Sequence, residues 1–195
     1  LTGIPELLNG FDAGEVEGIG AGGQMHGLVV LDKEDRVIRP AILWNDGRTA
    51  RQVEYLNETV GKEKLSTLTA NIAFAGFTAP KLLWMRENEP ELFRKIHKIM
   101  LPKDYINYVL TGVHSTDYSD ASGTLLLDVK RRVWSEEMLD ICGLSMEQMP
   151  RLFESFEPVG RIKPELAARL GVAADCVVAA GAGDNAAAAV GTGTG

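Results

Sequence analysis

A short apolar run near the end of the chain passes directly into an aspartate preceded by two glycines. Residues 176–180 (Cys-Val-Val-Ala-Ala) have the composition of a buried strand, and the turn 181–184 (Gly-Ala-Gly-Asp) follows at once. The next residues, 185–190, form an alanine-rich helix start. A strand that turns tightly into a helix is a building unit of layered α/β domains, so this segment favours an α/β fold for the chain.

The remaining apolar patterns predict further strands and helices. Apolar residues at i, i+3 and i+7 predict a helix over 49–60. Thr78 is predicted to cap another helix, whose buried side carries Leu82, Leu83 and Met85. The other predicted elements are strands over 16–19, 28–31, 41–44 and 124–127, helices over 102–110 and 165–170, and a loop over 116–123.

The composition is that of an ordinary globular protein and excludes several classes of function. The chain has 195 residues, of which 45% are apolar and 24% charged, and its net charge of −7 argues against nucleic acid as the main ligand. Two cysteines are too few for a disulfide framework or a zinc cluster, and no apolar run reaches the roughly 18 residues of a membrane span. Without a signal peptide, a cytoplasmic location is expected. We predict one α/β domain over 1–195 with a helical insertion near 49–112.

Two glycine patterns resemble dinucleotide-binding motifs. The spacing G-x-G-x-x-G occurs at 18–23, but a β-like run follows it in place of the helix that a pyrophosphate site requires. The variant G-x-G-x-x-A occurs at 181–186 in the correct strand-to-helix context. There Asp184 would put a carboxylate where the pyrophosphate should bind, which weakens the dinucleotide interpretation.

Asp184 itself has two compatible interpretations. A carboxylate at a helix N-terminus is stabilised by backbone amides and the helix dipole, and the preceding glycines let a substrate approach the backbone closely. That environment suits a general base that takes a proton from a hydroxyl group. The alternative is a helix N-cap, a common use of Asp at such a junction.

Several segments, in the same order along the chain, resemble the FGGY family of carbohydrate kinases. They are 24–27 (Gln-Met-His-Gly), 41–48 (Ala-Ile-Leu-Trp-Asn-Asp-Gly-Arg), 116–123 (Thr-Asp-Tyr-Ser-Asp-Ala-Ser-Gly) and 181–185 (Gly-Ala-Gly-Asp-Asn). The stretch 77–88 resembles the family's signature segment and departs from it at Met85, where Leu or Phe is usual. The Gln-Met-His-Gly stretch is most similar to the members that phosphorylate D-xylulose.

The resemblance implies an actin-like, RNase H-like α/β fold with a mixed sheet, in which two lobes bind ATP and sugar between them. This chain corresponds to most of the first, sugar-binding lobe. The opening strands, with an Asp-x-Gly-Thr turn that faces the phosphates, and the whole nucleotide lobe are expected to lie outside it. We therefore expect ATP and Mg²⁺ to be held mainly by other parts of the protein, with no metal ligand here. A lone lobe is expected to be inactive.

Carried over by position, the resemblance implies a catalytic base and a set of substrate-binding residues. The predicted base is Asp184, and the predicted substrate-binding residues are Met25, His26, Trp44, Asp46 and Asn185. A thioether can lie against the carbon face of a sugar, and an imidazole can exchange a hydrogen bond with a hydroxyl. Packing is the alternative for Met25 and Trp44, and a structural hydrogen bond for His26. Elsewhere, Asp117 and Asp120 are predicted to form a turn, and Lys81 and Trp84 to pack in a helix.

The leading prediction is ATP-dependent phosphorylation of D-xylulose to D-xylulose 5-phosphate. Alternatives are a related kinase acting on gluconate, ribulose or glycerol, a dinucleotide-dependent dehydrogenase fragment, and a non-catalytic module for sugar binding or protein interaction. The expected partner is a small-molecule sugar, with a homodimer as an open option. No nucleic acid and no membrane are expected.

Overall fold

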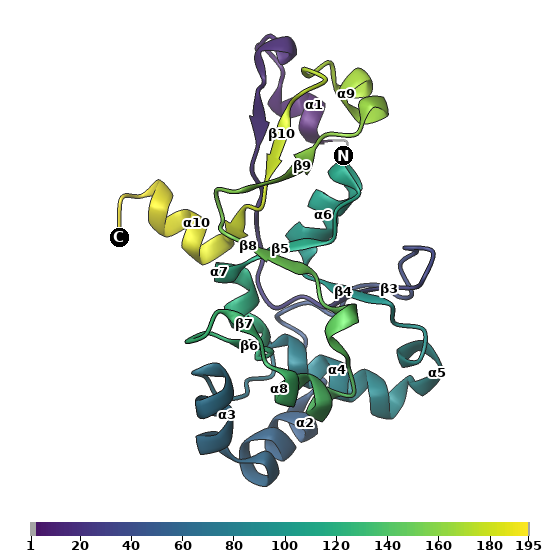
Figure 1. Ribbon diagram of the computed structural model, residues 1–195, viewed down its shortest axis with the longest axis vertical. Coiled ribbons are helices and arrows are strands. Elements are labelled where there is room, and N and C mark those ends of the chain that lie inside the picture. The colour runs from purple at the N-terminus through teal and green to yellow at the C-terminus, as the bar shows by residue number, and fades with distance from the viewer. Residues whose placement is uncertain (1–2, 195) are drawn as a thin grey trace.

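The predicted strand 176–180 forms β10 (Val177–Ala179) at the centre of a three-stranded sheet. The structure is a computed structural model that describes residues 3–194 (Figure 1). β10 pairs in parallel with β1 (Gly18–Ile19) and antiparallel with β9 (Pro158–Arg161). Both kinds of pairing in one sheet confirm the predicted mixed α/β class.

Beyond this sheet, the segments that follow β1 and β10 form a second parallel pair. β2 (Gly22–Gly23) pairs with β11 (Ala182–Gly183), with Gly22 opposite Ala182 and Gly23 opposite Gly183. Because parallel strands end at the same edge, the residues that follow β2 and β11 meet there. Those residues are 24–27 and Asp184, the two segments on which the predicted site depends.

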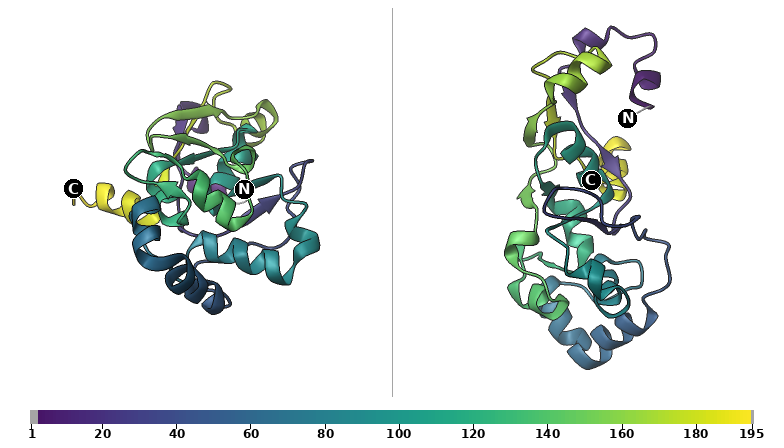
Figure 2. Two further views of the ribbon diagram at one scale, coloured as in Figure 1. Left: turned by 60° about the horizontal axis from the view of Figure 1, so that its bottom comes forward. Right: turned by 90° about the vertical axis from the view of Figure 1, so that its right-hand side faces the viewer.

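The other elements follow in an elongated arrangement, with the helices α2, α3, α4 and α8 at the end opposite β1 and β10 (Figures 1 and 2). The remaining strands are β3 (Val29–Leu31), β4 (Lys98–Met100), β5 (Ser115–Asp117), β6 (Leu127–Asp128), β7 (Val133–Trp134) and β8 (Arg151–Phe153). The helices are α1 (Gly3–Leu7), α2 (Ala50–Glu54), α3 (Lys62–Thr69), α4 (Thr78–Asn88), α5 (Pro90–Phe93), α6 (Pro102–Thr111), α7 (Tyr118–Ala121), α8 (Glu136–Cys142), α9 (Pro164–Leu170) and α10 (Asp184–Gly191). Short 3-10 turns cover 13–15, 122–124 and 146–148, and a π-helical stretch over 55–61 joins α2 to α3.

Two main hydrophobic cores support this arrangement, and a third, smaller cluster of Val29, Leu31 and Met100 lies on β3 and β4. The larger is built around α4, whose Leu82, Leu83 and Met85 are fully buried, which confirms their predicted positions. The smaller core lies under β9, β10 and α9. Between them runs α6, where the amide of Asn107 donates to the carbonyl of Ala180 at 2.8 Å and so ties the helix to the end of β10.

Glycines allow the two site-bearing segments to approach one another. Gly181 has φ +74°, and a Cβ there would lie 2.1 Å from the carbonyl oxygen of Ala21. A Cβ on Gly23 would lie 2.7 Å from Cβ of Lys103 in α6. Close backbone packing therefore accounts for glycines in both patterns, and no helix follows 18–23.

The predicted strand 41–44 is wrong. Ile42 alone makes a bridge, to Leu28, while Leu43 and Trp44 turn outward and Trp44 is 57% exposed. The chain leaves the sheet here because only Ile42 of this apolar run reaches the core.

The predicted loop 116–123 is also wrong, because the segment is structured and largely buried. It contains the end of β5, all of α7 and the start of a 3-10 turn. Its polar side chains find partners inside the protein, so polarity here does not indicate exposure. Thr78 likewise does not cap α4, since Phe77 occupies the cap position and the Thr78 hydroxyl donates to the carbonyl of His26 at 3.1 Å.

Both cysteines, Cys142 and Cys176, are free and buried. Within residues 3–194, no helix has both the length and the apolar character needed to cross a lipid bilayer.

The pairing of β2 with β11 predicts that alanine is tolerated very differently at two glycines, Gly181 and Gly20. Gly181→Ala should lower the free energy of unfolding by about 2–4 kcal/mol, because it combines an unfavourable φ with a backbone overlap. Gly20→Ala is the matched control, since a Cβ there meets nothing within 4 Å. Urea unfolding of both variants is the measurement, and equal stabilities would contradict this account of the strand pairing.

Candidate active site

A pocket of about 230 Å³ lies where β2 and β11 end. It is lined by Met25, His26, Trp44, Asp184 and Asn185, which come from three separate segments of the chain. Pockets for drug-sized ligands span roughly 300–1,000 Å³, so this one suits a smaller polar molecule. Five of the six predicted site residues are thus brought together at one place.

Asp184 is the first residue of α10, and the N-cap position belongs to Gly183. Its carboxylate is exposed at the pocket, where Oδ1 accepts a hydrogen bond from the amide of Asn185 at 3.0 Å. The simple N-cap interpretation of Asp184 is therefore wrong. A carboxylate in this position can receive a proton from a molecule held in the pocket.

His26 presents a defined hydrogen-bonding face. Its Nδ1 lies 2.8 Å from the carbonyl oxygen of Gly123 and must donate, because a carbonyl can only accept. Burial is the main cause that lowers the pKa of His26, so the ring is neutral at neutral pH and Nε2 is an acceptor. Phe77 stacks on the ring at 4.6 Å and fixes its plane.

Met25 covers the backbone that leads to the carboxylate. A Cβ on Gly183 would lie 2.9 Å from Cγ and 3.2 Å from Sδ of Met25, so only glycine fits beneath this side chain. In a dinucleotide motif, a pyrophosphate would lie against the backbone of such a glycine. Here the Met25 side chain occupies that place against Gly183. Trp44, 57% exposed, forms another side of the pocket.

Asp46, the sixth predicted residue, does not line the pocket. Its carboxylate forms a two-pronged pair with Arg48, at 2.9 Å to Nε and 2.7 Å to Nη2, which lowers the pKa of Asp46. The Arg48 guanidinium in turn lies 4.6 Å from the ring centroid of Trp84. Contact between Asp46 and a ligand stays a prediction.

A buried group of charges supports the pocket and was missed by the sequence analysis. The ammonium of Lys103 lies 2.6 Å from Asp104, 2.8 Å from Asp117 and 3.6 Å from Asp120, and all four side chains are at most 1% exposed. A usable signal exists in the sequence: Lys103 and Asn107 share the i, i+4, i+7 positions of α6 with the buried Leu110. The predicted turn role of Asp117 and Asp120 is incomplete, since Asp117 caps α7 but both carboxylates belong to this charge cluster.

The cluster reaches the backbone next to Asp184. One oxygen of Asp117 accepts from the hydroxyls of Ser119, at 2.5 Å, and Ser155, at 2.8 Å. The hydroxyl of Ser119 then accepts from the amide of Gly183 at 3.1 Å. The position of the Asp184 carboxylate is therefore tied to charges in the interior.

Two carboxyl groups of the cluster, those of Asp117 and Asp120, differ in protonation state at neutral pH. Burial raises the pKa of Asp120 to about 8, with the negative charges of Asp104 and Asp117 adding to the effect of burial. Burial also acts to raise the pKa of Asp117, but Lys103 and the serine hydroxyls outweigh it and the pKa is lowered. At neutral pH, Asp120 thus carries a proton and Asp117 is ionised.

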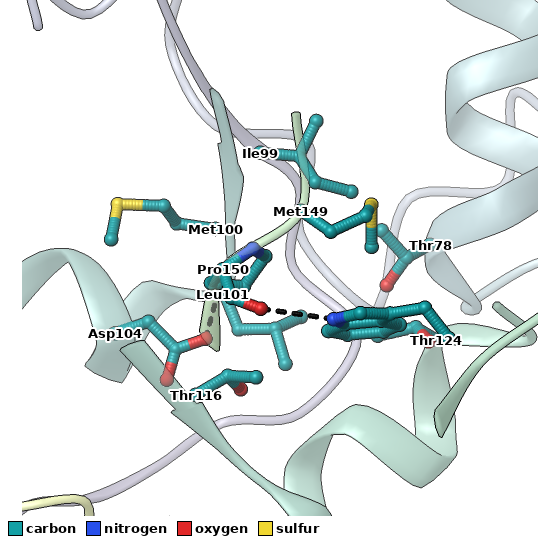
Figure 3. Close-up of a pocket in the computed structure, with 10 residues that line it drawn as sticks. Thr78, Ile99, Met100, Leu101, Asp104, Thr116, Thr124, Met149 and Pro150 are labelled. Atoms are coloured by element: carbon teal, nitrogen blue, oxygen red, sulfur yellow. Dashed lines mark hydrogen bonds between the residues drawn. The ribbon is translucent and has the colours of Figure 1, made fainter. Parts of the chain in front are cut away.

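A much smaller space lies beside the cluster, lined by Ile99 and Met100 of β4 together with Trp134 and Met149 (Figure 3). Its walls include Thr78, Asp104, Thr116 and Trp134, and the indole of Trp134 donates to the carbonyl of Pro150 at 2.9 Å. With a volume of about 10 Å³ it holds at most about one water molecule and cannot hold a sugar.

Among residues 3–194, no group of three or more His, Cys, Asp or Glu side chains is placed to hold a metal ion.

A family model for the FGGY family of carbohydrate kinases, N-terminal domain, matches residues 4–191. The chain belongs to the FGGY family of carbohydrate kinases. This FGGY chain is 51% identical over 179 residues to the xylulose kinase of Escherichia coli (strain K12), covering 92% of the chain and 36% of the relative. It spans 36% to 40% of the length of five xylulose kinases among its curated relatives.

Solved structures of FGGY kinases share the fold. A "xyloylose kinase" from Brucella ovis has 49% sequence identity and a TM-score of 0.85, over 89% of this chain and 35% of that one. A gluconate kinase from Lactobacillus acidophilus has 29% identity and a TM-score of 0.88, over 93% and 37%. These likenesses confirm the expected actin-like kinase fold.

The protonated Asp120 predicts an unusual pH dependence of stability. The folded protein keeps this proton up to about pH 8, whereas the unfolded chain loses it near pH 4, so Asp120 lowers the stability as pH rises between these values. Asp120→Asn removes this loss. Urea unfolding at pH 5 and pH 8 should show that its stability relative to the native protein improves with pH, by up to about 1 kcal/mol per pH unit.

Asp117→Asn is the matched control for that experiment. Its pKa is lowered in the folded state, so the ionised carboxylate stabilises the protein above about pH 4 and this contribution is lost as pH falls. We expect Asp117→Asn to be destabilised at pH 7 and at pH 5, and progressively less so as the pH falls below about 4. The same response from both variants would contradict the two assigned protonation states.

Proposed function

We propose that the complete protein uses ATP to phosphorylate D-xylulose to D-xylulose 5-phosphate in the cytoplasm, and that Asp184 is the general base. The observation that carries the proposal is the convergence of Asp184, Met25 and His26 on one small pocket from distant parts of the sequence. The xylulose kinases among its relatives support the choice of sugar.

Asp184 would act on the hydroxyl at C5. Its carboxylate accepts the hydroxyl proton while the oxygen attacks the terminal phosphorus of ATP, and the bond from that phosphorus to the bridging oxygen of ADP breaks. Phosphoryl transfer requires little covalent help from a protein, because positioning and charge stabilisation supply most of the rate. We propose that the ATP contacts, and any Mg²⁺, belong mainly to parts of the protein beyond this chain.

The other pocket residues would hold the sugar. The free acceptor Nε2 of His26 fits a sugar hydroxyl, and the thioether of Met25 fits a carbon face. Asn185 supplies an amide beside the base for a second hydroxyl, and Trp44 offers an apolar wall.

The sugar can be tested with a substrate panel. We expect the complete protein to use D-xylulose with a kcat/KM at least about tenfold above its values for gluconate, ribulose and glycerol. A coupled assay for ADP release makes the comparison. Since a gluconate kinase shares this fold at 29% identity, a preference for gluconate would replace D-xylulose in the proposal and keep the kinase chemistry.

The base can be tested by Asp184→Asn in the complete protein. A positioned general base contributes about 10²- to 10⁴-fold, so kcat should fall by that factor while calorimetry still detects sugar binding. Asp175→Asn, an exposed aspartate before β10, is the matched control and should keep its activity. A kcat within about tenfold of the native value for Asp184→Asn would remove the base assignment.

A further inference from the structure

His26 has a backbone conformation that its side chain disfavours. Its φ is +67°, in the left-handed region that residues with a Cβ seldom adopt. Such a conformation persists only where surrounding contacts hold it, and it is often found at ligand sites. The contacts that hold His26 therefore bear on the geometry of the pocket.

The carbonyl of His26 is held by two donors from α4. The ammonium of Lys81 donates to it at 2.8 Å and the hydroxyl of Thr78 at 3.1 Å. Lys81 also donates to the carbonyl of Gly76 at 2.5 Å, in the loop that leads into α4. These bonds join the pocket loop to a helix more than 50 residues away in sequence.

Lys81 is buried without a charged partner. Its side chain is 0% exposed, and among residues 3–194 it forms no ion pair, whereas the equally buried Lys103 contacts three carboxylates. Burial lowers the pKa of Lys81 to about 8, opposed in part by the charge of Asp46. An apolar side chain would fill this space without the cost of burying a charge, so packing does not explain a lysine here.

We propose that Lys81, together with Thr78, is a positioning residue of the sugar pocket: it holds the peptide between His26 and Gly27 in the orientation that directs the imidazole at the sugar. Neither residue lines the pocket, so both act through His26. The proposal rests on the proposed function, because it assigns His26 to the sugar.

The charge of Lys81 supports the same role. Burial is the main cause of the lowered pKa of His26, and the charge of Lys81 lowers it further. The hydrogen bond to Gly123 and the charge of Asp184, from η3 (Ser122–Thr124) and α10, act in the opposite direction. Lys81 thus helps to keep Nε2 free as an acceptor.

The test uses Lys81→Met in the complete protein. We expect the KM for D-xylulose to rise about tenfold or more, because the charged donor to His26 is lost, and the KM for ATP to stay within twofold. The acidic limb of the pH profile of kcat/KM should move to higher pH, because His26 becomes protonated more readily. A packing role alone would change neither the ratio of the two KM values nor the pH profile.

Two threonine variants keep the test decisive if Lys81→Met fails to fold. Thr78→Val removes the second donor at constant shape and should raise the sugar KM by roughly threefold or more. Thr78→Ser keeps the hydroxyl and should leave the sugar KM near the native value. Lys130→Met, at an exposed lysine, is the control for loss of a positive charge.

The outcomes separate this proposal from the proposed function. If the native protein does not phosphorylate D-xylulose, the proposed sugar is wrong, and the variants are compared on the sugar that it does use. The positioning role is overturned if the native protein is active and Thr78→Val keeps the native sugar KM and pH profile. Where Lys81→Met folds, it must also keep both. A selective rise in the sugar KM, rescued by Thr78→Ser, supports it.

Discussion

The close parallel pairing of β2 with β11 is the constraint on which the rest of this structure depends. Gly181 lets its strand reach the backbone of Ala21, and this contact places the Gln-Met-His segment beside the N-terminus of α10. Strands that run in parallel and end together create a site at their carboxyl edge without further elements. Helices support the pocket, but the backbone pairing of β2 with β11 brings the His26 imidazole and the Asp184 carboxylate together.

Two buried lysines show how differently a charge can be accommodated. Lys103 sits among three aspartates, and one of these, Asp117, is linked through Ser119 to the peptide before Asp184. Lys81 has backbone carbonyls as its only hydrogen-bond acceptors among residues 3–194. Lys103 supports the peptide that precedes Asp184, and Lys81 holds the loop that carries the imidazole of His26. Interior charges thus set the relative position of the two groups.

The sequence predicted those features that local patterns determine. The apolar run of β10, the helix that begins at Asp184 and the buried positions of α4 follow from periodicity and composition. The meeting of Asp184 with Met25 and His26 was predicted from the family resemblance, since no local pattern relates segments some 160 residues apart.

The failures have a physical explanation. Segment 116–123 was predicted to be a loop because polar residues usually face solvent, but Lys103 neutralises part of its charge in the interior. The apolar run 41–44 was predicted to be a strand, but only Ile42 reaches the core, and Trp44 is 57% exposed beside the pocket. In both cases burial in the folded protein departs from what local polarity suggests.

The hydrogen bond from His26 Nδ1 to Gly123 fixes which tautomer the neutral ring adopts. A ring locked in this way can accept at Nε2 but cannot donate there. In the proposed sugar complex, Nε2 would therefore distinguish a hydroxyl from groups of similar size that carry no hydrogen. An analogue with fluorine or a keto oxygen in place of the hydroxyl that faces Nε2 would bring two lone pairs together, and electronic repulsion rather than lack of space would disfavour it.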